Sequence, residues 1–302
     1  MNLKLILVCS VLLIAVALTL PVFSTPVAEI VHISSTYVPE WSALATTVAS
    51  VVRHHEPAIF SDAFDSVYVL REARNIATSE NDSWWVSSGA YFYSTGEYGR
   101  TIVGALPDQD PRRLRYEDTN PTDTDQGYHP QNIFRLVHSG TWSDFTQEMD
   151  FMILADHLSQ SPFRNSSNGI LFFNRYQDEF NLYYSGIRAD GHVTIKKKVD
   201  NVYYTLSYDP FITSSVYDRE SNPNVLPHNT WIGLRSEVVT NADKTVTIRL
   251  YVDIGKTGKW VLATEAVDDG KSYGGKIHGP GHTGIRTDFM DVQFDNYSVR
   301  EK

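Results

Sequence analysis

The chain has 302 residues, 42% of them hydrophobic, and a formal net charge of −10 at pH 7. This acidic balance argues against a general nucleic-acid or anionic-membrane binder. Its single cysteine, Cys9, lies in the N-terminal segment, so disulfides, cysteine metal sites and cysteine nucleophiles are excluded for the rest of the chain.

The N-terminal segment predicts export. Lys4 precedes an apolar run over residues 5–20, and small residues follow, with plausible cleavage after Ser24 or Ala28. Residues 1–28 therefore read as a secretory signal peptide. The alternative is an uncleaved N-terminal anchor, because the run is about long enough to span a thin bilayer. The protein is thus expected to be secreted or extracellular, or tethered at the cell surface, with no membrane contact beyond such an anchor.

The rest of the chain divides into a leader and one large domain. Residues 29–59 predict a leader or linker, in which "SALATTVASVVRHH" can form a short amphipathic helix. Residues 60–302 predict a single β domain, because runs of period two dominate there and no Pro/Ser/Gly-rich linker divides them.

The predicted strands follow one another closely along this domain. In chain order they include "DSVYVLREA", "YFYST", "IFRLVH", "FTQEMDFMIL", "GILFFNRY", "NLYYSGIRA", "HVTIKKKV", "VYYTLSY", "WIGLRSEVV", "TVTIRLYVD", "WVLATEAV", "HTGIRTDF" and "DVQFDNYSV". Asp190-Gly191 and Asp200-Asn201 are two-residue hairpin signals, because these residues tolerate positive φ. Many short strands with such turns indicate a sandwich or jelly roll.

Two long polar segments interrupt the strands. Residues 107–132 and 208–230 contain several prolines and offer no clear strand or helix pattern. Loops of this length in a compact domain are usually functional or mobile. We expect both to border one rim of a sheet.

More than half of the chain resembles a known superfamily. The residues that carry the likeness are "SNGILFFNRYQDEFNLYYSGIRADGHVTIKKK", "WIGLRSEV", "IRLYVD" and "GHTGIRTDFMDVQFDNYSV". They resemble the concanavalin A-like lectin/glucanase superfamily, and within it the laminarinase-like and keto-disaccharide-hydrolase-like (family-16-glycosidase-like) domains. The resemblance implies an all-β fold, a concanavalin A-like β-sandwich (jelly roll) that is mostly antiparallel. It also implies that "FSDAFDS" lies beside "VQFDNYSV". Function does not follow, since this fold hosts enzymes, lectins and passive modules alike.

A cationic and aromatic patch stands out within this acidic chain. Strand alternation places Lys197 on the mostly apolar face of "HVTIKKKV", and Lys196 and Lys198 on the other face. Aromatic rings stack on sugar rings, while Arg and Lys pair with carboxylate or sulfate groups. The residues that we predict to contact a glycan are Arg175, Tyr184, Arg188, Lys196 and Lys198. The alternative is a solvated polar face on which lysine stems shield the sheet.

No complete catalytic set is visible. Glu148 and Asp150 match the first two acids of the laminarinase-type E-x-D motif, but Ile153 and Leu154 occupy the two positions open to the third acid. A lyase needs groups that neutralise an acidic sugar and a Tyr or His that moves protons. Candidates for these roles are Arg135, Gln147, His157, Asn174, Arg175, Tyr184 and Arg188. The R-S-E-L, Q-I-H and Y-F-K-A-G strands of alginate lyases are not reproduced. Catalytic residues therefore stay unassigned, and a polysaccharide lyase or glycoside hydrolase stays an open alternative.

Two groups of acids are candidate calcium ligands. If the first and last strands pair, Asp62 and Asp65 come close to Asp295, and related jelly rolls often hold structural calcium at such a seam. A second set, in the first long loop, comprises Asp118, Asn120, Asp123 and Asp125. We expect no organic cofactor.

The sequence thus predicts a secreted or cell-surface carbohydrate-binding β-jelly-roll protein. Its expected partner is an extracellular polysaccharide or other glycan, and an anionic glycan explains the lysines better than a neutral one. The alternatives are a polysaccharide-degrading enzyme and a structural surface module without sugar affinity.

Overall fold

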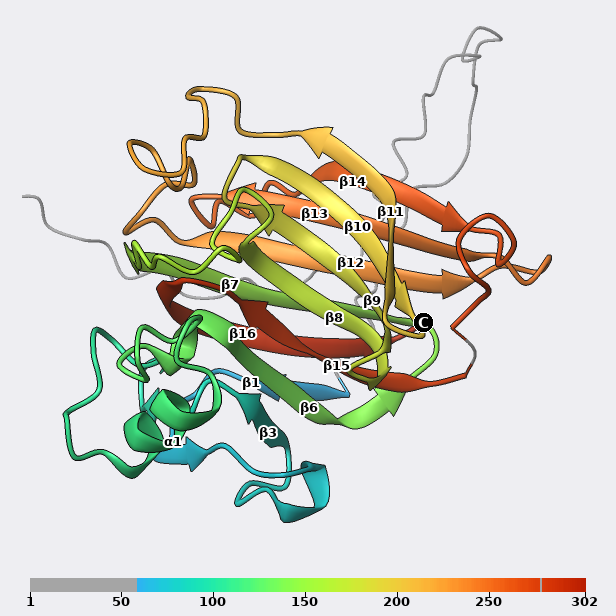
Figure 1. Cartoon of the computed structure of the whole chain (residues 1–302). Helices are drawn as coiled ribbons and strands as arrows, with labels where there is room; N and C mark the ends of the chain where they lie inside the picture. The colour runs from blue at the N-terminus through green and yellow to red at the C-terminus, as the bar shows by residue number, and fades with distance from the viewer. Residues whose placement is uncertain (1–58, 278) are drawn as a thin grey trace, which may run out of the picture. The chain divides into compact units, whose positions relative to one another are not determined.

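The computed structural model describes residues 59–277 and 279–302 (Figure 1). The predicted signal peptide or anchor over residues 1–28 lies outside the described residues, as does the leader over 29–59 apart from Ile59. Within the described ranges, no helix combines the length and the apolar character needed to cross a membrane.

Two β-sheets make up the domain. The nine-stranded sheet contains, from edge to edge, β14 (Val261–Asp268), β13 (Val246–Ile254), β12 (Ile232–Thr240), β7 (Phe145–Asp156), β16 (Met290–Glu301), β5 (Gly99–Arg100), β4 (Tyr91–Thr95) and β2 (Val67–Arg71), with β1 (Phe60–Asp62) also paired to β16. The seven-stranded sheet contains β11 (Val202–Pro210), β10 (His192–Val199), β9 (Asn181–Arg188), β8 (Gly169–Asp178), β15 (Gly281–Thr287), β6 (Phe134–Trp142) and β3 (Trp84–Ser88). Figure 1 shows the two sheets as stacked layers.

The core lies between the layers. Alternation along β7 buries Met149, Phe151 and Ile153, and these pack in one cluster with Phe172 of β8 and Ile195 of β10. Burial of such side chains stabilises each of them by about 1.5–3 kcal/mol. Every pair of neighbouring strands in the two described sheets is antiparallel. The predicted all-β, mostly antiparallel jelly-roll sandwich is confirmed.

The turn signals in the sequence mark real hairpins. Asp200 and Asn201 have φ of 47° and 67°, which gives the two-residue turn between β10 and β11. Gly191, with φ of 81°, lies in the turn between β9 and β10. At the seam of the chain, β1 pairs with β16 so that Phe60 faces Val299, as predicted for "FSDAFDS" and the terminal strand.

One helix lies in the first long loop, where the sequence pattern indicated no regular structure. Helix α1 spans Pro111–Thr119. Two short 3₁₀ segments also occur, η1 (Ile76–Thr78) before it in the chain and η2 (Pro130–Ile133) after it. The Asp110 carboxylate accepts hydrogen bonds from the backbone N–H groups of Arg112 and Arg113, and Pro111 occupies the first helical position. This start signal was present in the sequence. The helix is polar and short, so it has no apolar stripe that would have revealed it.

Candidate functional site

A groove runs across the outer face of the seven-stranded sheet, the face turned away from the core. It consists of two adjoining cavities of about 680 and 490 Å³. Both are lined by Asp123, Ile133, Arg135, Tyr184 and Tyr203, so they form one continuous site. Their sizes fall in the range of sites that hold small organic ligands.

Strand register builds the floor of the groove. Lys196 of β10 lies opposite Tyr184 of β9, and Lys198 lies opposite Tyr203 of β11. Because side chains alternate between faces, all four point to the same side of the sheet. The same alternation sends Lys197 into the core, as the sequence predicts.

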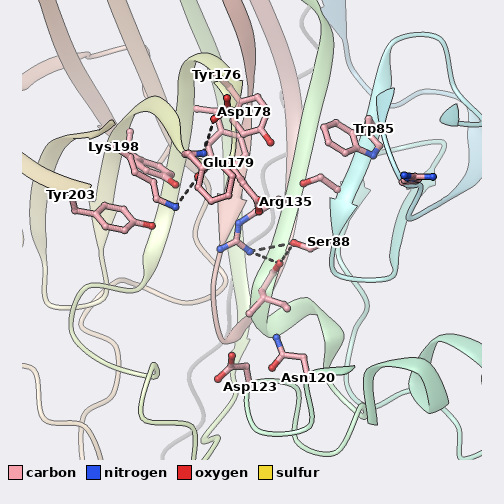
Figure 2. Close-up of a pocket in the computed structure, with 16 residues that line it drawn as sticks. Trp85, Ser88, Asn120, Asp123, Arg135, Tyr176, Asp178, Glu179, Lys198 and Tyr203 are labelled. Carbon is pink, nitrogen blue, oxygen red and sulfur yellow. Dashed lines mark hydrogen bonds between the residues drawn. The ribbon is translucent and has the colours of Figure 1, made fainter. Parts of the chain in front are cut away.

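Two guanidinium groups lie side by side on this floor. Arg135 of β6 and Arg286 of β15 are direct neighbours across the strand pair. Arg135 donates to the Ile133 carbonyl at 2.6 Å and to the Ser88 hydroxyl at 3.2 Å (Figure 2). Arg286 donates to the Asp288 carboxylate at 2.9 Å, and that carboxylate lies 3.9 Å from Arg135. Two cations thus share one anion.

Burial and neighbouring charges shift the pKa values of both guanidinium groups. Burial lowers the pKa of Arg135, and the neighbouring Arg286 lowers it further. For Arg286, burial works in the same direction, but the Asp288 carboxylate together with Tyr184 and Tyr203 outweighs it and raises the pKa. Both groups stay charged at any physiological pH. An anionic ligand would therefore meet cations whose orientation is already fixed.

Two tyrosines of contrasting acidity lie beside these cations. The rings of Tyr184 and Tyr203 are stacked with centroids 6.2 Å apart. Burial raises the pKa of Tyr184 to about 12. Burial acts on Tyr203 in the same sense, but Arg286 and Lys198 outweigh it and hold the pKa of this phenol below its usual value. Tyr203 is 53% exposed, so its hydroxyl is the more acidic and the more accessible of the two.

The two outward lysines differ in their partners. The Lys198 ammonium donates to the Glu179 carbonyl at 2.7 Å and lies 5.0 Å from the centre of the Tyr203 ring (Figure 2). In the described part of the chain, the Lys196 ammonium has neither a hydrogen bond nor an ion pair. Burial lowers the pKa of Lys196, and Arg188 and Arg286 lower it further. Of these two lysines, Lys196 is therefore the one whose ammonium is free to pair with an anionic ligand.

Aromatic side chains cover much of the larger cavity. Besides the two tyrosines of the floor, the rings that line it are Trp85, Phe173, Tyr176 and Phe180. Trp85 is fixed by a hydrogen bond of 2.8 Å from its indole N–H to the Ala73 carbonyl. Its neighbour Trp84 is fully buried in the core. This arrangement offers flat apolar faces to a ligand.

Three of the five predicted glycan contacts line the groove, namely Tyr184, Lys196 and Lys198. Arg188 lies near Lys196, but it donates to the Asp190 carboxylate at 2.8 Å and stacks on the Tyr208 ring at 4.6 Å.

Arg175 does not join them. A bulge in β8 gives Arg175 a φ of 47° and turns its side chain to the sheet margin, where it donates to Asp144 at 2.9 Å and to Thr240 at 2.6 Å. Arg175 therefore does not line the groove.

Arg286 and Tyr203 also line the groove, but neither was among the glycan contacts predicted from the sequence. A signal existed for Tyr203: the Asp200-Asn201 turn fixes the register of its hairpin and so places Tyr203 opposite Lys198. Arg286 had no such local signal, because β15 neighbours β6 and β8 only through the tertiary strand order.

The acids of the E-x-D motif lie on the opposite side of the molecule. Glu148 is paired with Arg235 at 2.6 Å, and Asp150 with Lys256 at 2.8 Å, on the nine-stranded sheet. Both carboxylates already have cationic partners and neither lines the groove.

The other lyase candidates are dispersed. Gln147 and Asn174 are buried between the sheets and hydrogen-bonded to each other at 2.8 Å. His157 is buried against Asp291 at 2.8 Å. Only Arg135 and Tyr184 of that set line the groove.

The predicted calcium ligands are not gathered. Asp62 accepts hydrogen bonds from the Trp84 indole at 2.8 Å and the Phe64 amide at 2.7 Å, while Asp295 pairs with Lys256 at 3.3 Å. In the first long loop, Asp125 accepts from His129 at 2.9 Å. Across residues 59–277 and 279–302, no group of three or more His, Cys, Asp or Glu side chains is placed to hold a metal. Calcium at the seam with Asp62, Asp65 and Asp295 stays a prediction of the sequence alone.

No family model matches the chain, and no curated protein matches it in sequence. Among solved structures, it is similar to the carbohydrate binding module CBM66 from Bacillus subtilis, with 14% identity, 73% of this chain and 96% of that chain covered, and a TM-score of 0.44. It is also similar to a galectin-like-fold protein of unknown function from Bacillus subtilis, with 11% identity, 82% and 96% covered, and a TM-score of 0.45.

A third structure is a prokaryotic β-1,3-1,4-glucanase (lichenase) from a mouse hindgut metagenome, with 11% identity, 80% and 99% covered, and a TM-score of 0.41. Likenesses of this strength do not decide function. The strand order and the core of this chain establish its fold.

Proposed function

We propose that this protein binds an anionic extracellular polysaccharide in the groove of the seven-stranded sheet. The observation that carries the proposal is the unpartnered Lys196 ammonium, held beside Arg135 and Arg286 on an aromatic floor. A half-buried cation without a hydrogen bond or ion pair gains stability when a ligand supplies an anionic partner. A carboxylate or sulfate on a sugar does so, while the sugar ring stacks on the aromatic side chains.

Residues 1–28 carry the features of a signal peptide or an N-terminal anchor. We propose on this basis that the groove meets its ligand outside the cell, either on a free protein or on one that is tethered to the surface.

The test is affinity electrophoresis of the full chain against anionic and neutral polysaccharides at one ionic strength. Lys196→Met and Arg286→Met are expected to weaken binding of the anionic polymers about 10–100-fold, the usual effect of losing a charge-assisted hydrogen bond. Lys259→Met is the matched control, because Lys259 is exposed in the loop before β14, on the other sheet. Equal retardation by neutral polymers, or unchanged binding by Lys196→Met, would contradict the proposal.

A second function, eliminative cleavage of a uronate-containing polysaccharide, is favoured by Tyr203. Its phenol is exposed and acidified by Arg286 and Lys198, as a general base requires. The phenolate would take the proton from the carbon beside the carboxylate, and that electron pair would form a C=C bond as the glycosidic C–O bond breaks. The phenol would then return the proton to the departing oxygen, while the guanidinium groups hold the carboxylate.

Cleavage is checked by the ultraviolet absorbance of unsaturated uronate ends during incubation with uronate-containing polysaccharides, both those in which every sugar is acidic and those in which acidic and neutral sugars alternate. The wild-type chain is expected to produce them, and Tyr203→Phe to lose at least 100-fold in rate while still binding the polymer. Full turnover by Tyr203→Phe would exclude this role. Binding without any turnover by the wild type would leave a carbohydrate-binding protein alone.

A further inference from the structure

The two halves of the groove differ in charge. The smaller cavity is lined by the cations Arg135, Lys196 and Arg286 against the carboxylates of Asp123 and Asp288. The Asp288 carboxylate is already paired with two guanidinium groups, that of Arg286 at 2.9 Å and that of Arg135 at 3.9 Å. Asp123 accepts a hydrogen bond of 2.6 Å from the Ser161 hydroxyl. This half keeps a positive excess, concentrated at Lys196.

The larger cavity has no such excess. Its cations, Arg74, Arg135 and Lys198, are matched in number by three carboxylates, those of Asp123, Asp178 and Glu179. The last two belong to the tip of the β8–β9 hairpin and border the cavity next to Tyr176 (Figure 2).

Lys198 does not neutralise these hairpin acids. Its ammonium donates a hydrogen bond of 2.7 Å to the Glu179 backbone carbonyl and forms an ion pair with neither carboxylate. Asp178 accepts bonds from the Phe180 amide at 2.8 Å and the Asn181 side chain at 3.1 Å, which fixes its carboxylate in place. The Glu179 carboxylate has no partner among the described residues and is exposed. A negative group on a ligand would therefore meet unneutralised carboxylates at this end.

We propose that the groove selects a glycan in which an acidic sugar is followed by a neutral sugar, and disfavours a polyuronate in which every sugar is acidic. The acidic sugar occupies the cavity of Lys196 and Arg286. The neutral sugar occupies the aromatic cavity, where the hairpin acids repel a second carboxylate. Specificity of this kind comes from an unfavourable contact with the wrong ligand as well as a favourable one with the right ligand. This inference rests on the proposed function.

The test measures binding of three hexasaccharides to the full chain by calorimetry at one ionic strength. The first alternates glucuronate with N-acetylglucosamine, the second contains only glucuronate, and the third is a neutral β-glucan. We expect the alternating ligand to bind about tenfold more tightly than the all-glucuronate ligand, although it carries half as many charges. Non-specific attraction would give the opposite order.

Glu179→Gln identifies the cause of the selection. Glu179 contacts the Lys198 ammonium through its backbone carbonyl and not through its carboxylate. Glu179→Gln therefore removes the charge and keeps that contact. This substitution is expected to reduce, several-fold, the ratio of the affinity for the alternating ligand to the affinity for the all-glucuronate ligand. Glu97→Gln is the matched control, because Glu97 is an exposed acid in the β4–β5 turn of the other sheet, and its ratio should equal that of the wild type.

The outcomes separate the two proposals. If the wild type binds both anionic ligands equally, or prefers the all-glucuronate ligand, the selection is overturned while anionic glycan binding stands. An unchanged ratio in Glu179→Gln overturns the selection as well. If none of the three ligands binds, or the neutral one binds best, both proposals are overturned.

Discussion

The Lys197 ammonium lies 2.7 Å from the Asp268 carboxylate, and both side chains are fully buried between the two sheets. Tyr183 donates a second hydrogen bond of 2.6 Å to the same carboxylate, and Lys197 also donates to the Gly275 carbonyl. The pair ties β10 of one sheet to β14 of the other. The three consecutive lysines thus have different roles: Lys197 is a core residue, whereas its two neighbours face the groove.

This pair predicts a strongly coupled effect on stability. Lys197→Met leaves a buried carboxylate without its cation, and we expect the free energy of unfolding to fall by about 3–5 kcal/mol. Asp268→Leu, which leaves the buried ammonium without its anion, should cost a similar amount. The double variant Lys197→Met/Asp268→Leu should lose much less than the sum, since neither charge is then left unpaired. Urea unfolding of all three measures this, and additive losses would show that the two residues are not coupled.

A second prediction concerns the hairpin tip. Lys198→Met removes the hydrogen bond to the Glu179 carbonyl and the cation beside the Phe180 ring, 5.6 Å away. We expect faster amide hydrogen exchange over residues 178–181 and weaker glycan binding, because this tip borders the larger cavity. Exchange in β7, which lies in the other sheet, serves as the internal control. Unchanged exchange at the tip would show that Lys198 does not hold it.

The sequence could predict the parts of this site that follow from local pattern. Alternation in "HVTIKKKV" separated Lys197 from its neighbours correctly, because the side chains of a strand change face at every residue. The fold followed from regular strand spacing and recognisable turns. Arg175 shows the limit, since one bulge in β8 reversed the direction that alternation implies.

Long-range placement was beyond local pattern. Arg286 meets Arg135 only because β15 inserts between β6 and β8 in the sheet, although β6 lies far earlier in the chain. The acidity of Tyr203 depends on the same neighbour, so it could not be read from residues 202–210. The E-x-D motif failed as a catalytic signal for a related reason, since its strand, β7, belongs to the nine-stranded sheet, where Glu148 pairs with Arg235 of the neighbouring β12, away from the groove.

The groove also predicts how binding depends on pH. The pKa of Lys196 lies below 10.5 and that of Tyr203 below 10.0, in the first case chiefly through burial and in the second through Arg286 and Lys198. As the pH rises, Lys196 loses its positive charge and Tyr203 gains a negative one, so both changes weaken the attraction for a carboxylate. We expect affinity for an anionic glycan to decline at a lower pH than ordinary lysine and tyrosine side chains would give. Calorimetry over the alkaline range measures this.

Tyr203→Phe separates the two contributions. Ultraviolet titration of the wild type should show one tyrosine that ionises before the others, and this early transition should be missing in the variant. The decline in affinity should then begin at higher pH, leaving only the part due to Lys196. An early transition that persists in Tyr203→Phe would assign it to another tyrosine.

Asp291 predicts the response to acid. Burial would raise the pKa of this carboxyl, but hydrogen bonds from His157, Gln131 and Gly104 outweigh burial and hold the pKa below 3.8. A depressed pKa stabilises the fold above the pKa of the unfolded chain, and this contribution is lost as the pH falls through the folded pKa. Asp291→Asn should therefore be less stable than the wild type at neutral pH, and the gap should narrow as the pH drops below about 4. Urea unfolding at several pH values measures the gap. A gap that is constant with pH would mean that Asp291 contributes through packing and neutral hydrogen bonds and not through its charge.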